Sequence, residues 1–467
     1  MSGRTDGDGE PRADGEPRTA DCDPPEATDD AAEIAPDDLV ETHVVTVFLR
    51  NDSDVLLLER SDAVGSYSGR WGAVAGHAEG GPDAAAREEI REETRLDPGT
   101  DAALVRRGDP FAVTDADLGT RWVVHPYLFD CDTRSVDPNE ETAAYEWAPP
   151  TAILRRETVP DLWASYDRVR PTPESIAGDG EHGAAYISVR ALEVLRDEAA
   201  VAVERGDDPG AAWSDLTAVA RDLLDARPAM AVVANRVNGV VHRAGESATP
   251  AALEAAAHEG IERASTADGD AAALAAGEIP DSVASLSRSG TVASALERAD
   301  PAEVLVAESR PGREGVETAE RLTETTDAAV TLTTDAALAD RLAAMGADAL
   351  VVGADTILPD GRVVNKVGTR AAATAAASEG IDCLVVAASD KIAPERGRPD
   401  EAARSVDREE RDPAEVYDGD ADLRVANPTF DVTPADRIGA LVTERGVLDV
   451  DAVGEVAAEH RALADWQ

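Results

Sequence analysis

The first 60 residues change abruptly from polar to apolar. Residues 1–40 carry almost no large apolar side chain, so they cannot bury enough surface to offset the entropy of ordering, and we predict a disordered acidic tail. Two apolar runs follow, at 44–49 and 55–60, and the residues between them, 51–54, are Asn, Asp, Ser and Asp. Because these polar residues favour turns, the pattern predicts a β-hairpin.

The hairpin opens a folded unit that we place at residues 41–170. Trp71 and a glycine-rich segment follow the hairpin, a helix is predicted to begin at Asp83, and the apolar run 122–129 predicts a further strand. A stretch rich in Pro and Gly then predicts a linker at 171–182.

The remainder of the chain predicts a helical part at 183–300 and a parallel sheet at 301–467. Alanine-rich segments with helical character occupy the first of these, at 184–205, 209–226, 250–264 and 270–276. Short apolar runs alternate with helical stretches in the second, at 304–306, 328–332, 349–352 and 383–386. Such alternation is typical of a buried parallel sheet, so the fold class is α/β with a Rossmann-like C-terminal domain.

Acidic residues dominate the charge of the chain. The formal net charge is −50, with 94 Asp and Glu spread along the whole sequence. Salt screens the repulsion between carboxylates, so this composition is typical of adaptation to high salt, and we expect a halophilic, archaeal source. The same charge opposes direct binding to nucleic acid, which we do not expect. No apolar run approaches the ~18 residues of a membrane span, so we expect a cytoplasmic protein without a membrane partner. The three cysteines, Cys22, Cys131 and Cys383, lack the spacing of metal ligands.

Three carboxylates share one face of the helix that begins at Asp83. Glu89, Glu92 and Glu93 are three and four residues apart, which makes them neighbours on a helix surface. Carboxylates this close repel one another unless a hard cation such as Mg²⁺ shares them. The spacing therefore allows two interpretations, a Mg²⁺ site or a solvated acidic face.

The hairpin, Trp71 and the segment 76–96 resemble a Nudix domain. In the Nudix box of the family, Glu92 and Glu93 take the positions of the metal-binding pair, and Glu89 takes the position of the preceding box glutamate. The resemblance implies an α/β/α sandwich and Mg²⁺-dependent hydrolysis of a nucleoside-diphosphate derivative.

The box departs from the family pattern in three places. Glu88 stands where the family has Arg, Arg95 stands where it has Gly, and Gly76 lies two residues too close to the helix. The family Arg helps to orient a ligand glutamate, so its replacement by an acid weakens the site. We therefore expect a weakened hydrolase site, and the alternative is an active hydrolase with Glu89 in a catalytic role.

Polar residues follow the predicted strands of the C-terminal part. Carboxyl ends of parallel strands meet at one edge of an open α/β sheet, which is where such sheets bind ligands. The sequence therefore predicts a ligand site at this edge. The residues are Ser309, Arg310, Asp335, Asp355, Asp390 and Lys391.

The segment 353–369 adds further candidates. Asp355, Asn365, Lys366 and Thr369 place a carboxylate, an amide, an ammonium and a hydroxyl within one predicted strand-turn-strand unit. Of the 44 Lys and Arg residues, two are lysines, Lys366 and Lys391. In a chain that otherwise uses arginine, these lysines suggest positions that need a compact ammonium. The alternative is an ordinary strand end with polar loop residues.

From about Gly180 to its end, the chain resembles the family shared by the alpha, beta and delta subunits of translation initiation factor 2B, ribose-1,5-bisphosphate isomerase and methylthioribose-1-phosphate isomerase. The resemblance implies a helical part that leads into a Rossmann-like domain, and a homodimer formed through the C-terminal domain. It also places Arg227 among the expected ligand contacts. The matching stretches, in family order, are 182–185, 227–228, 289–292, 308–311, 353–355, 365–369 and 427–434.

Isomerases of this family use a Cys and an Asp to move protons. Asp355 matches the Asp, and Ser287 stands where the Cys falls. A hydroxyl has no accessible ionised form near neutrality, whereas a thiol of pKa ~8.5 can be tuned into range. We therefore expect a protein that binds a phosphorylated sugar or nucleotide, with Arg310 and Lys366 at the phosphate and Asp355 and Asn365 at the hydroxyls. The alternative is a sugar-phosphate isomerase in which Asp355 is catalytic.

Overall fold

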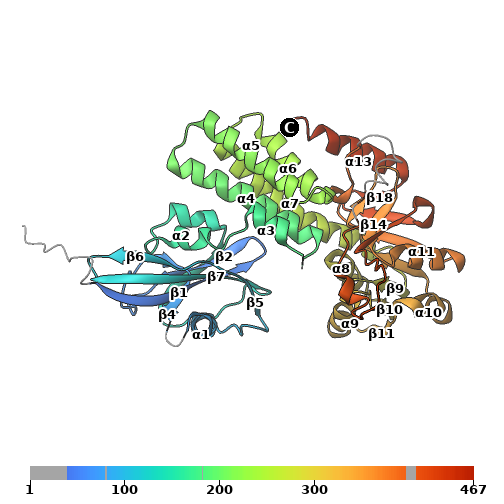
Figure 1. Ribbon diagram of the computed structural model, residues 1–467, viewed down its shortest axis with the longest axis horizontal. Helices are drawn as coiled ribbons and strands as arrows, with labels where there is room; N and C mark the ends of the chain where they lie inside the picture. The colour runs from blue at the N-terminus through green and yellow to red at the C-terminus, as the bar shows by residue number, and fades with distance from the viewer. Residues whose placement is uncertain (1–38, 79–80, 181, 396–405, 407) are drawn as a thin grey trace, which may run out of the picture.

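The computed structural model describes residues 39–78, 81–180, 182–395, 406 and 408–467. All but the last two residues of the predicted acidic tail lie outside these ranges. The described chain forms an N-terminal sheet domain, a set of long helices and a C-terminal sheet domain (Figure 1). The predicted α/β fold class is therefore confirmed.

The N-terminal domain is an α/β/α sandwich. β1 (Val40–Asn51) and β2 (Asp54–Arg60) form the predicted hairpin, and β1 also pairs in parallel with β7 (Thr120–Cys131). Successive side chains of a strand point to opposite faces, so β1 contributes to two cores. Val45, Val47 and Leu49 pack with α1 (Pro82–Thr94), whereas Phe48 packs with α2 (Leu162–Asp167). The other elements are β3 (Trp71–Gly72), β4 (Val74–His77), β5 (Ala102–Arg107), β6 (Phe111–Asp115), β8 (Thr142–Ala148) and η2 (Pro150–Arg155).

The helical part matches the prediction in two helices and differs in three places. α4 (Ala184–Arg205) and α5 (Pro209–Ala226) have the predicted bounds. The predicted linker contains a short helix, α3 (Pro173–Gly178), which is stabilised by a capping box. One helix, α7 (Pro250–Ala276), replaces the two predicted ones, because the polar residues between them lie at exposed or half-buried positions. α6 (Ala231–Ala244) was not predicted.

The C-terminal domain has a seven-stranded sheet whose order is β11-β10-β9-β12-β15-β17-β18. Strands β11 to β17 pair in parallel, as predicted. The sheet begins at β9 (Ser282–Leu286), inside the range assigned to the helical part, because this strand carries serines and an alanine rather than a β-branched run. The other strands are β10 (Glu303–Ala307), β11 (Ala329–Thr333), β12 (Ala349–Val352), β15 (Asp382–Val386), β17 (Ala440–Thr443) and β18 (Gly446–Leu448).

The chain order reverses between β9 and β12, so a crevice forms outside the carboxyl ends of these two strands. A small antiparallel sheet of β13 (Thr356–Ile357), β14 (Val363–Lys366) and β16 (Phe430–Thr433) lies beyond β12. It contains most of the predicted segment 353–369. The helices of this domain are α8 (Gly290–Ala299), α9 (Glu314–Thr325), α10 (Leu338–Met345), α11 (Thr369–Ser378) and α13 (Val450–Ala462).

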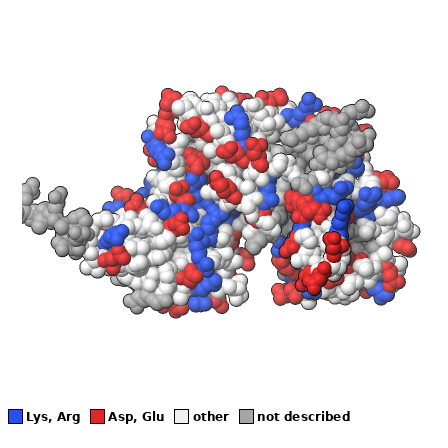
Figure 2. Space-filling view, in the orientation of Figure 1, with Lys and Arg blue, Asp and Glu red and all other residues white. Residues whose placement is uncertain are grey.

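Acidic side chains are spread over the face seen in Figure 2, with basic side chains between them. Many of the surface pairs are Arg with Asp or Glu, such as Arg155 with Glu254 at 2.7 Å. Within the described ranges, no helix is both long and apolar enough to cross a membrane.

Candidate functional site

A cavity of about 330 Å³ lies at the carboxyl ends of β9 and β12. Ser287 and Ser289 reach it from the loop after β9, Gly353 and Asp355 from the loop after β12, and other side chains come from the helical part and the small sheet. The predicted ligand residues that line it are Asp355, Asn365, Lys366, Lys391 and Arg227. Residues from separate predicted segments therefore meet at the expected edge of the sheet.

Both lysines of the chain line this cavity, and both are largely buried. Lys366 is 6% exposed and forms an ion pair with Glu314 at the start of α9. Lys391 is 7% exposed, and its Nζ donates a hydrogen bond to the Ala354 carbonyl at 2.6 Å. Burial raises the pKa of Asp355, although Lys391 and Lys366 oppose this shift. The cavity thus combines two ammonium groups with a carboxyl that retains its proton more readily than an exposed aspartate.

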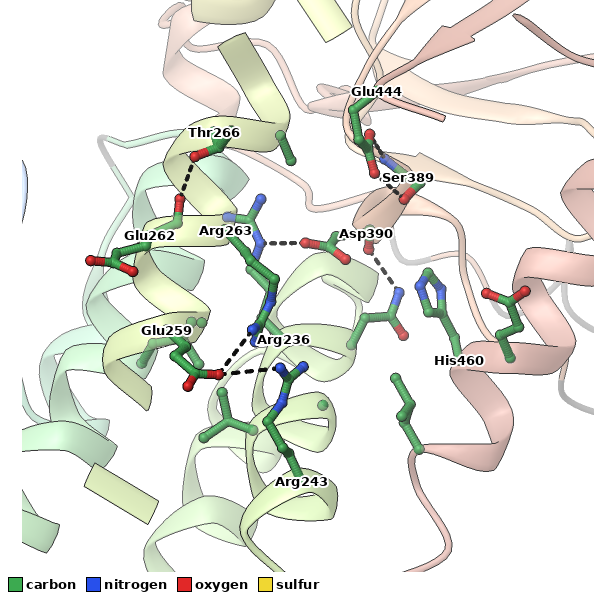
Figure 3. A pocket seen from close by; sticks show the side chains of 18 of the residues that line it. Arg236, Arg243, Glu259, Glu262, Arg263, Thr266, Ser389, Asp390, Glu444 and His460 are labelled. Atoms are coloured by element: carbon green, nitrogen blue, oxygen red, sulfur yellow. Dashed lines mark hydrogen bonds and ion pairs between the residues drawn. The ribbon is translucent and has the colours of Figure 1, made fainter. Parts of the chain in front are cut away.

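Lys391 is the last residue of a short helix, η4 (Ser389–Lys391), whose first two residues, Ser389 and Asp390, are seen in Figure 3. Ser389 and Asp390 line a second cavity, of about 780 Å³, whereas Lys391 lines the first. Asn235 on α6 donates from Nδ2 to the carbonyls of Asp390 at 2.7 Å and Ile392 at 2.8 Å. Arg236 on the same helix donates from Nε to Asp390 Oδ2 at 2.9 Å. The unpredicted helix α6 therefore fixes the backbone that carries Lys391.

Ser309 and Arg310 do not belong to the described lining of the cavity. Ser309 is fully buried, and its hydroxyl accepts a hydrogen bond from the backbone N–H of Ser287. Asp335 accepts the backbone N–H groups of Ser309 at 2.8 Å and Arg310 at 2.6 Å, while the Arg310 side chain is exposed. These contacts shape the loop that presents Ser287.

Thr369 and Arg227 also make contacts within the protein. Thr369 Oγ1 donates to the Lys366 carbonyl at 2.7 Å and accepts from Asn365 Nδ2 at 3.1 Å, so it positions two residues of the cavity without lining it. Arg227 lines the cavity, but its Nε donates to the Ile176 carbonyl at 2.9 Å and its Nη2 to the Asp179 carbonyl.

Sequence reasoning missed several lining residues, among them Asp179, His182 and Glu314. His182 begins the stretch 182–185 that carried a family resemblance, which was the available signal. Asp179 and Glu314 gave none, because tertiary packing brings them to the cavity from segments far apart in sequence.

The N-terminal domain has its own cavity, of about 500 Å³, lined by Glu89, Glu92 and Glu141 among others. Glu141, just before β8, was not predicted. Glu93 instead lies buried, and its Oε1 accepts the backbone N–H of Ala75 at 3.2 Å.

Glu89 approaches β4 so closely that a Cβ on Gly76 would lie 1.7 Å from its Oε1. Burial, with repulsion from Glu92 and Glu141, raises the pKa of Glu89 to about 7. Burial also raises the pKa of Glu93 to about 8. Carboxylate oxygens suit Mg²⁺. Among the described residues, however, no group of three or more Asp, Glu, His or Cys side chains is arranged to hold a metal ion. Glu79 lies outside that set.

The chain is similar over most of its length to proteins of known family. The model of the NUDIX domain matches residues 41–169. A ribose 1,5-bisphosphate isomerase of Haloferax volcanii is 32% identical over 305 residues, covering 62% of this chain and 92% of that protein. A methylthioribose-1-phosphate isomerase of Pseudomonas fluorescens is 30% identical over 348 residues, covering 66% of this chain and 93% of that protein.

A solved structure shares the fold of the C-terminal part. The translation initiation factor eIF-2B of Pyrococcus horikoshii has a TM-score of 0.50 and 25% identity, covering 59% of this chain and 94% of that one. The model of the Initiation factor 2 subunit family matches residues 180–450. The chain therefore belongs to the Initiation factor 2 subunit family and carries an N-terminal Nudix domain.

Proposed function

We propose that the cavity between β9 and β12 binds a phosphorylated sugar or nucleotide. The observation that carries this proposal is the convergence of the two lysines of the chain, Lys366 and Lys391, on one cavity beside Asp355. Two buried ammonium groups provide compact positive charge for a phosphate. Asp355 and Asn365 offer acceptors and donors to sugar hydroxyls.

The relatives favour a sugar 1-phosphate as the ligand class. By their names, they act on ribose 1,5-bisphosphate and on methylthioribose 1-phosphate, which both carry a phosphate on C1. The assembly we propose is a homodimer through the C-terminal domain, which light scattering at high salt tests directly.

Calorimetry in molar KCl with ribose 1,5-bisphosphate, ribose 5-phosphate and nucleoside monophosphates tests the ligand proposal. At least one should bind, and Lys366→Ala and Lys391→Ala should each weaken its binding by 10-fold or more, because about 1.5–3 kcal/mol is typical of a hydrogen bond to a charged group. Arg341→Ala is the matched control, since Arg341 is exposed on α10 and pairs with its neighbour Asp340. Absence of binding by every ligand overturns the proposal.

For the Nudix domain, we propose a weakened Mg²⁺-dependent site for nucleoside-diphosphate derivatives. Two departures support weakness: Glu93 is engaged with the Ala75 backbone, and Glu88 replaces the family arginine. The second candidate function is an active hydrolase. It is supported by the cavity of the N-terminal domain, which is lined by Glu89, Glu92 and Glu141. Mg²⁺-dependent release of a nucleotide or phosphate across a broad diphosphate panel, lost in Glu92→Gln, would establish the active form.

A further inference from the structure

The second cavity beside η4 has no part in the function proposed above. Its volume, about 780 Å³, is within the range of about 300–1,000 Å³ that is usual for small-molecule sites. No described residue lines both this cavity and the cavity that contains Asp355. We call it the α6–α7 cavity. The lining residues that carry the argument are Asn235, Arg236, Arg243, Glu259, Arg263 and Asp390.

Three arginines meet in this cavity (Figure 3). Arg236 and Arg243 are seven residues apart on α6, which is about two helical turns, so they share one face of the helix. Arg263 reaches the cavity from α7. Glu259 joins two of the arginines, because its Oε2 lies 3.4 Å from Arg243 Nη1 and 3.5 Å from Arg263 Nη1. Hydrogen bonds between charged groups are usually about 2.7–2.9 Å long, so both contacts are loose.

These guanidinium groups can donate to a further anion. Arg236 is 5% exposed, and its Nη2 has no hydrogen-bond partner among the described residues, although Asp268 Oδ2 lies 3.8 Å away. Burial, together with the charge of Arg243, lowers the pKa of Arg263, so added negative charge is favourable there. In a chain whose formal net charge is −50, this cavity is therefore a place where positive charge is incompletely neutralised.

The other acidic side chains of the lining are bound within the protein or exposed. Asp390 Oδ2 accepts from Arg236 Nε at 2.9 Å, and Glu444 Oε2 accepts the backbone N–H of Ser389 at 2.8 Å. An anion that enters the cavity can therefore replace the loose carboxylate of Glu259 and leave these tighter contacts in place. The exposed acids of the lining are Glu262, Asp270 and Glu459.

A buried acceptor lies in the same lining. Asn235 Nδ2 donates to the carbonyls of Asp390 and Ile392, which fixes the orientation of the amide. Asn235 is 3% exposed, and its Oδ1 has no hydrogen-bond partner among the described residues. Buried polar atoms are almost always hydrogen-bonded to protein or water, so Oδ1 is a place for a donor from outside the chain.

We propose that the α6–α7 cavity is a second binding site, which takes a phosphate monoester that also carries a hydroxyl group, such as a sugar phosphate. Arg236, Arg243 and Arg263 hold the phosphate, because a guanidinium presents paired donors that match phosphate oxygens. The hydroxyl donates to Asn235 Oδ1. The phosphate displaces the carboxylate of Glu259.

A ligand at this site also acts on the cavity that contains Asp355. Arg236 binds the Asp390 side chain and Asn235 binds the Asp390 carbonyl, and the next residue, Lys391, lines the other cavity. A phosphate that draws the Arg236 guanidinium therefore shifts η4 and with it Lys391. Each ligand then changes the affinity of the other by the same factor. This coupling rests on the proposed function, whereas the α6–α7 site does not.

Calorimetry of the full chain in molar KCl tests the site with ribose 5-phosphate as the probe. The titration uses Lys366→Ala, and Lys391→Ala as a second background, because each weakens the other cavity. Adding Arg243→Ala or Arg263→Ala should weaken binding by 10-fold or more, since each removes hydrogen bonds to a charged group. Adding Glu259→Gln should instead strengthen binding several-fold, because it removes the competing carboxylate.

Arg321→Ala is the matched control. Arg321 is an exposed arginine on α9 whose Nε lies 2.7 Å from Glu297 Oε1, so its loss also breaks a pair with a glutamate. It should leave the affinity for ribose 5-phosphate unchanged. Far-UV circular dichroism verifies that each variant is folded.

The outcomes separate the second site from the proposed function. Absence of binding in both lysine backgrounds, or binding that neither Arg243→Ala nor Arg263→Ala weakens, overturns the α6–α7 site. If the proposed function fails instead, the wild type still binds ribose 5-phosphate, and Lys366→Ala leaves its affinity unchanged.

Inorganic phosphate at saturating concentration tests the coupling. It should change the Kd of the wild type for ribose 1,5-bisphosphate by about 5-fold or more, and the change should vanish in Arg263→Ala. An unchanged Kd in the wild type overturns the coupling, and so does an equal change in Arg263→Ala, which indicates direct competition in the other cavity. Absence of ribose 1,5-bisphosphate binding overturns the coupling together with that ligand for the first cavity.

Discussion

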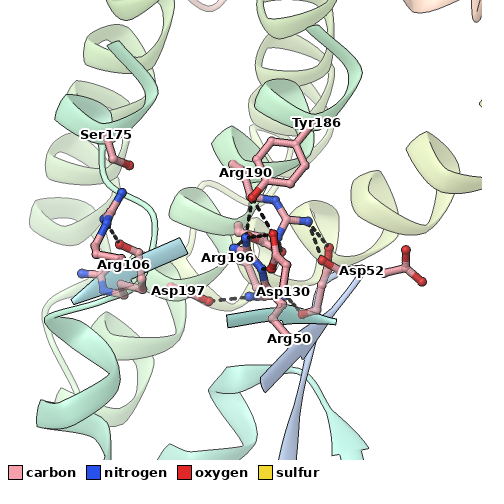
Figure 4. Close-up of polar contacts among 12 residues, drawn as sticks. Arg50, Asp52, Arg106, Asp130, Ser175, Tyr186, Arg190, Arg196 and Asp197 are labelled. Carbon is pink, nitrogen blue, oxygen red and sulfur yellow. Dashed lines mark hydrogen bonds and ion pairs between the residues drawn. The ribbon is translucent and has the colours of Figure 1, made fainter. Parts of the chain in front are cut away.

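The buried charge cluster between the Nudix domain and α4 makes the stability of the N-terminal domain depend on a residue outside it. Glu193 on α4 is fully buried, and its Oε1 lies 3.2 Å from Arg190 Nη1 and its Oε2 3.5 Å from Arg50 Nη1. Burial lowers the pKa of Arg50, but Glu193 and Asp130 outweigh this and leave it raised. Burial lowers the pKa of Arg190, whose Nη2 donates to the carbonyl of Asp52 (Figure 4).

Glu193→Gln should therefore destabilise the protein strongly. Removing one member of a buried ion pair leaves an uncompensated charge and costs about 3–5 kcal/mol. Glutamine retains an acceptor, so we expect about 3 kcal/mol. The control, Glu259→Gln, breaks exposed pairs with Arg243 at 3.4 Å and Arg263 at 3.5 Å, and should cost about 0–1 kcal/mol.

Urea denaturation at constant molar KCl measures both variants by tryptophan fluorescence. Trp71, Trp122, Trp147 and Trp163 belong to the N-terminal domain, out of six tryptophans, so this signal reports chiefly that domain. With a slope of about 2 kcal/mol/M, a loss of about 3 kcal/mol lowers the midpoint by about 1.5 M. Salt screens buried pairs little, so the difference should persist in molar KCl. Equal midpoints for Glu193→Gln and Glu259→Gln would refute a dry ionic interface between the domains.

Three further predictions concern the C-terminal part. Glu314→Gln should tighten binding of a phosphate ligand, because it frees the buried Lys366 ammonium; calorimetry showing weaker binding contradicts this. Gly315→Ala should lower the free energy of unfolding by about 1–3 kcal/mol, because the added Cβ would lie 1.9 Å from the Ala307 carbonyl oxygen. Its control is Gly269→Ala within α7, where the added Cβ meets no atom within 4 Å and should raise the free energy of unfolding by about 0.5–1 kcal/mol. Burial lowers the pKa of His460 below its ordinary 6.5, so the imidazole binds a proton more readily in the unfolded chain than in the folded protein. The neutral, buried His460 therefore contributes to the free energy of unfolding above about pH 6.5, and this contribution is lost as the pH falls. His460→Gln should therefore show a smaller drop in urea midpoint from pH 7.5 to 5.5 than the wild type, and an equal drop would contradict the assignment.

Strong local patterns predicted much of the fold. Val45, Val47 and Leu49 lie on one face of β1 and alternate with residues that point to the other face. The turn between β1 and β2 is rich in Asp and Asn, so local sequence is enough to predict the hairpin. The bounds of α4 and α5 were predicted to the residue because local capping residues mark them. Gly206 follows the last residue of α4, and Asp208 precedes the first residue of α5. β9 was missed because serines and an alanine interrupt its apolar run. α6 was missed because five of its residues are valines, which favour strands over helices.

The sequence by itself determined the α/β class, most of the order of elements and the chemical character of the ligand residues, because these depend on side-chain type and short spacing. Tertiary structure alone decided which of those residues share a cavity. It turned Ser309 and Thr369 inward to hold the backbone, kept Lys366 and Lys391 at the cavity, and moved Glu93 onto the Ala75 amide. It also brought Asp179 and His182 into the lining of the cavity that contains Asp355, across about 170 residues of chain, because the packing of helices on a sheet follows no spacing rule along the sequence.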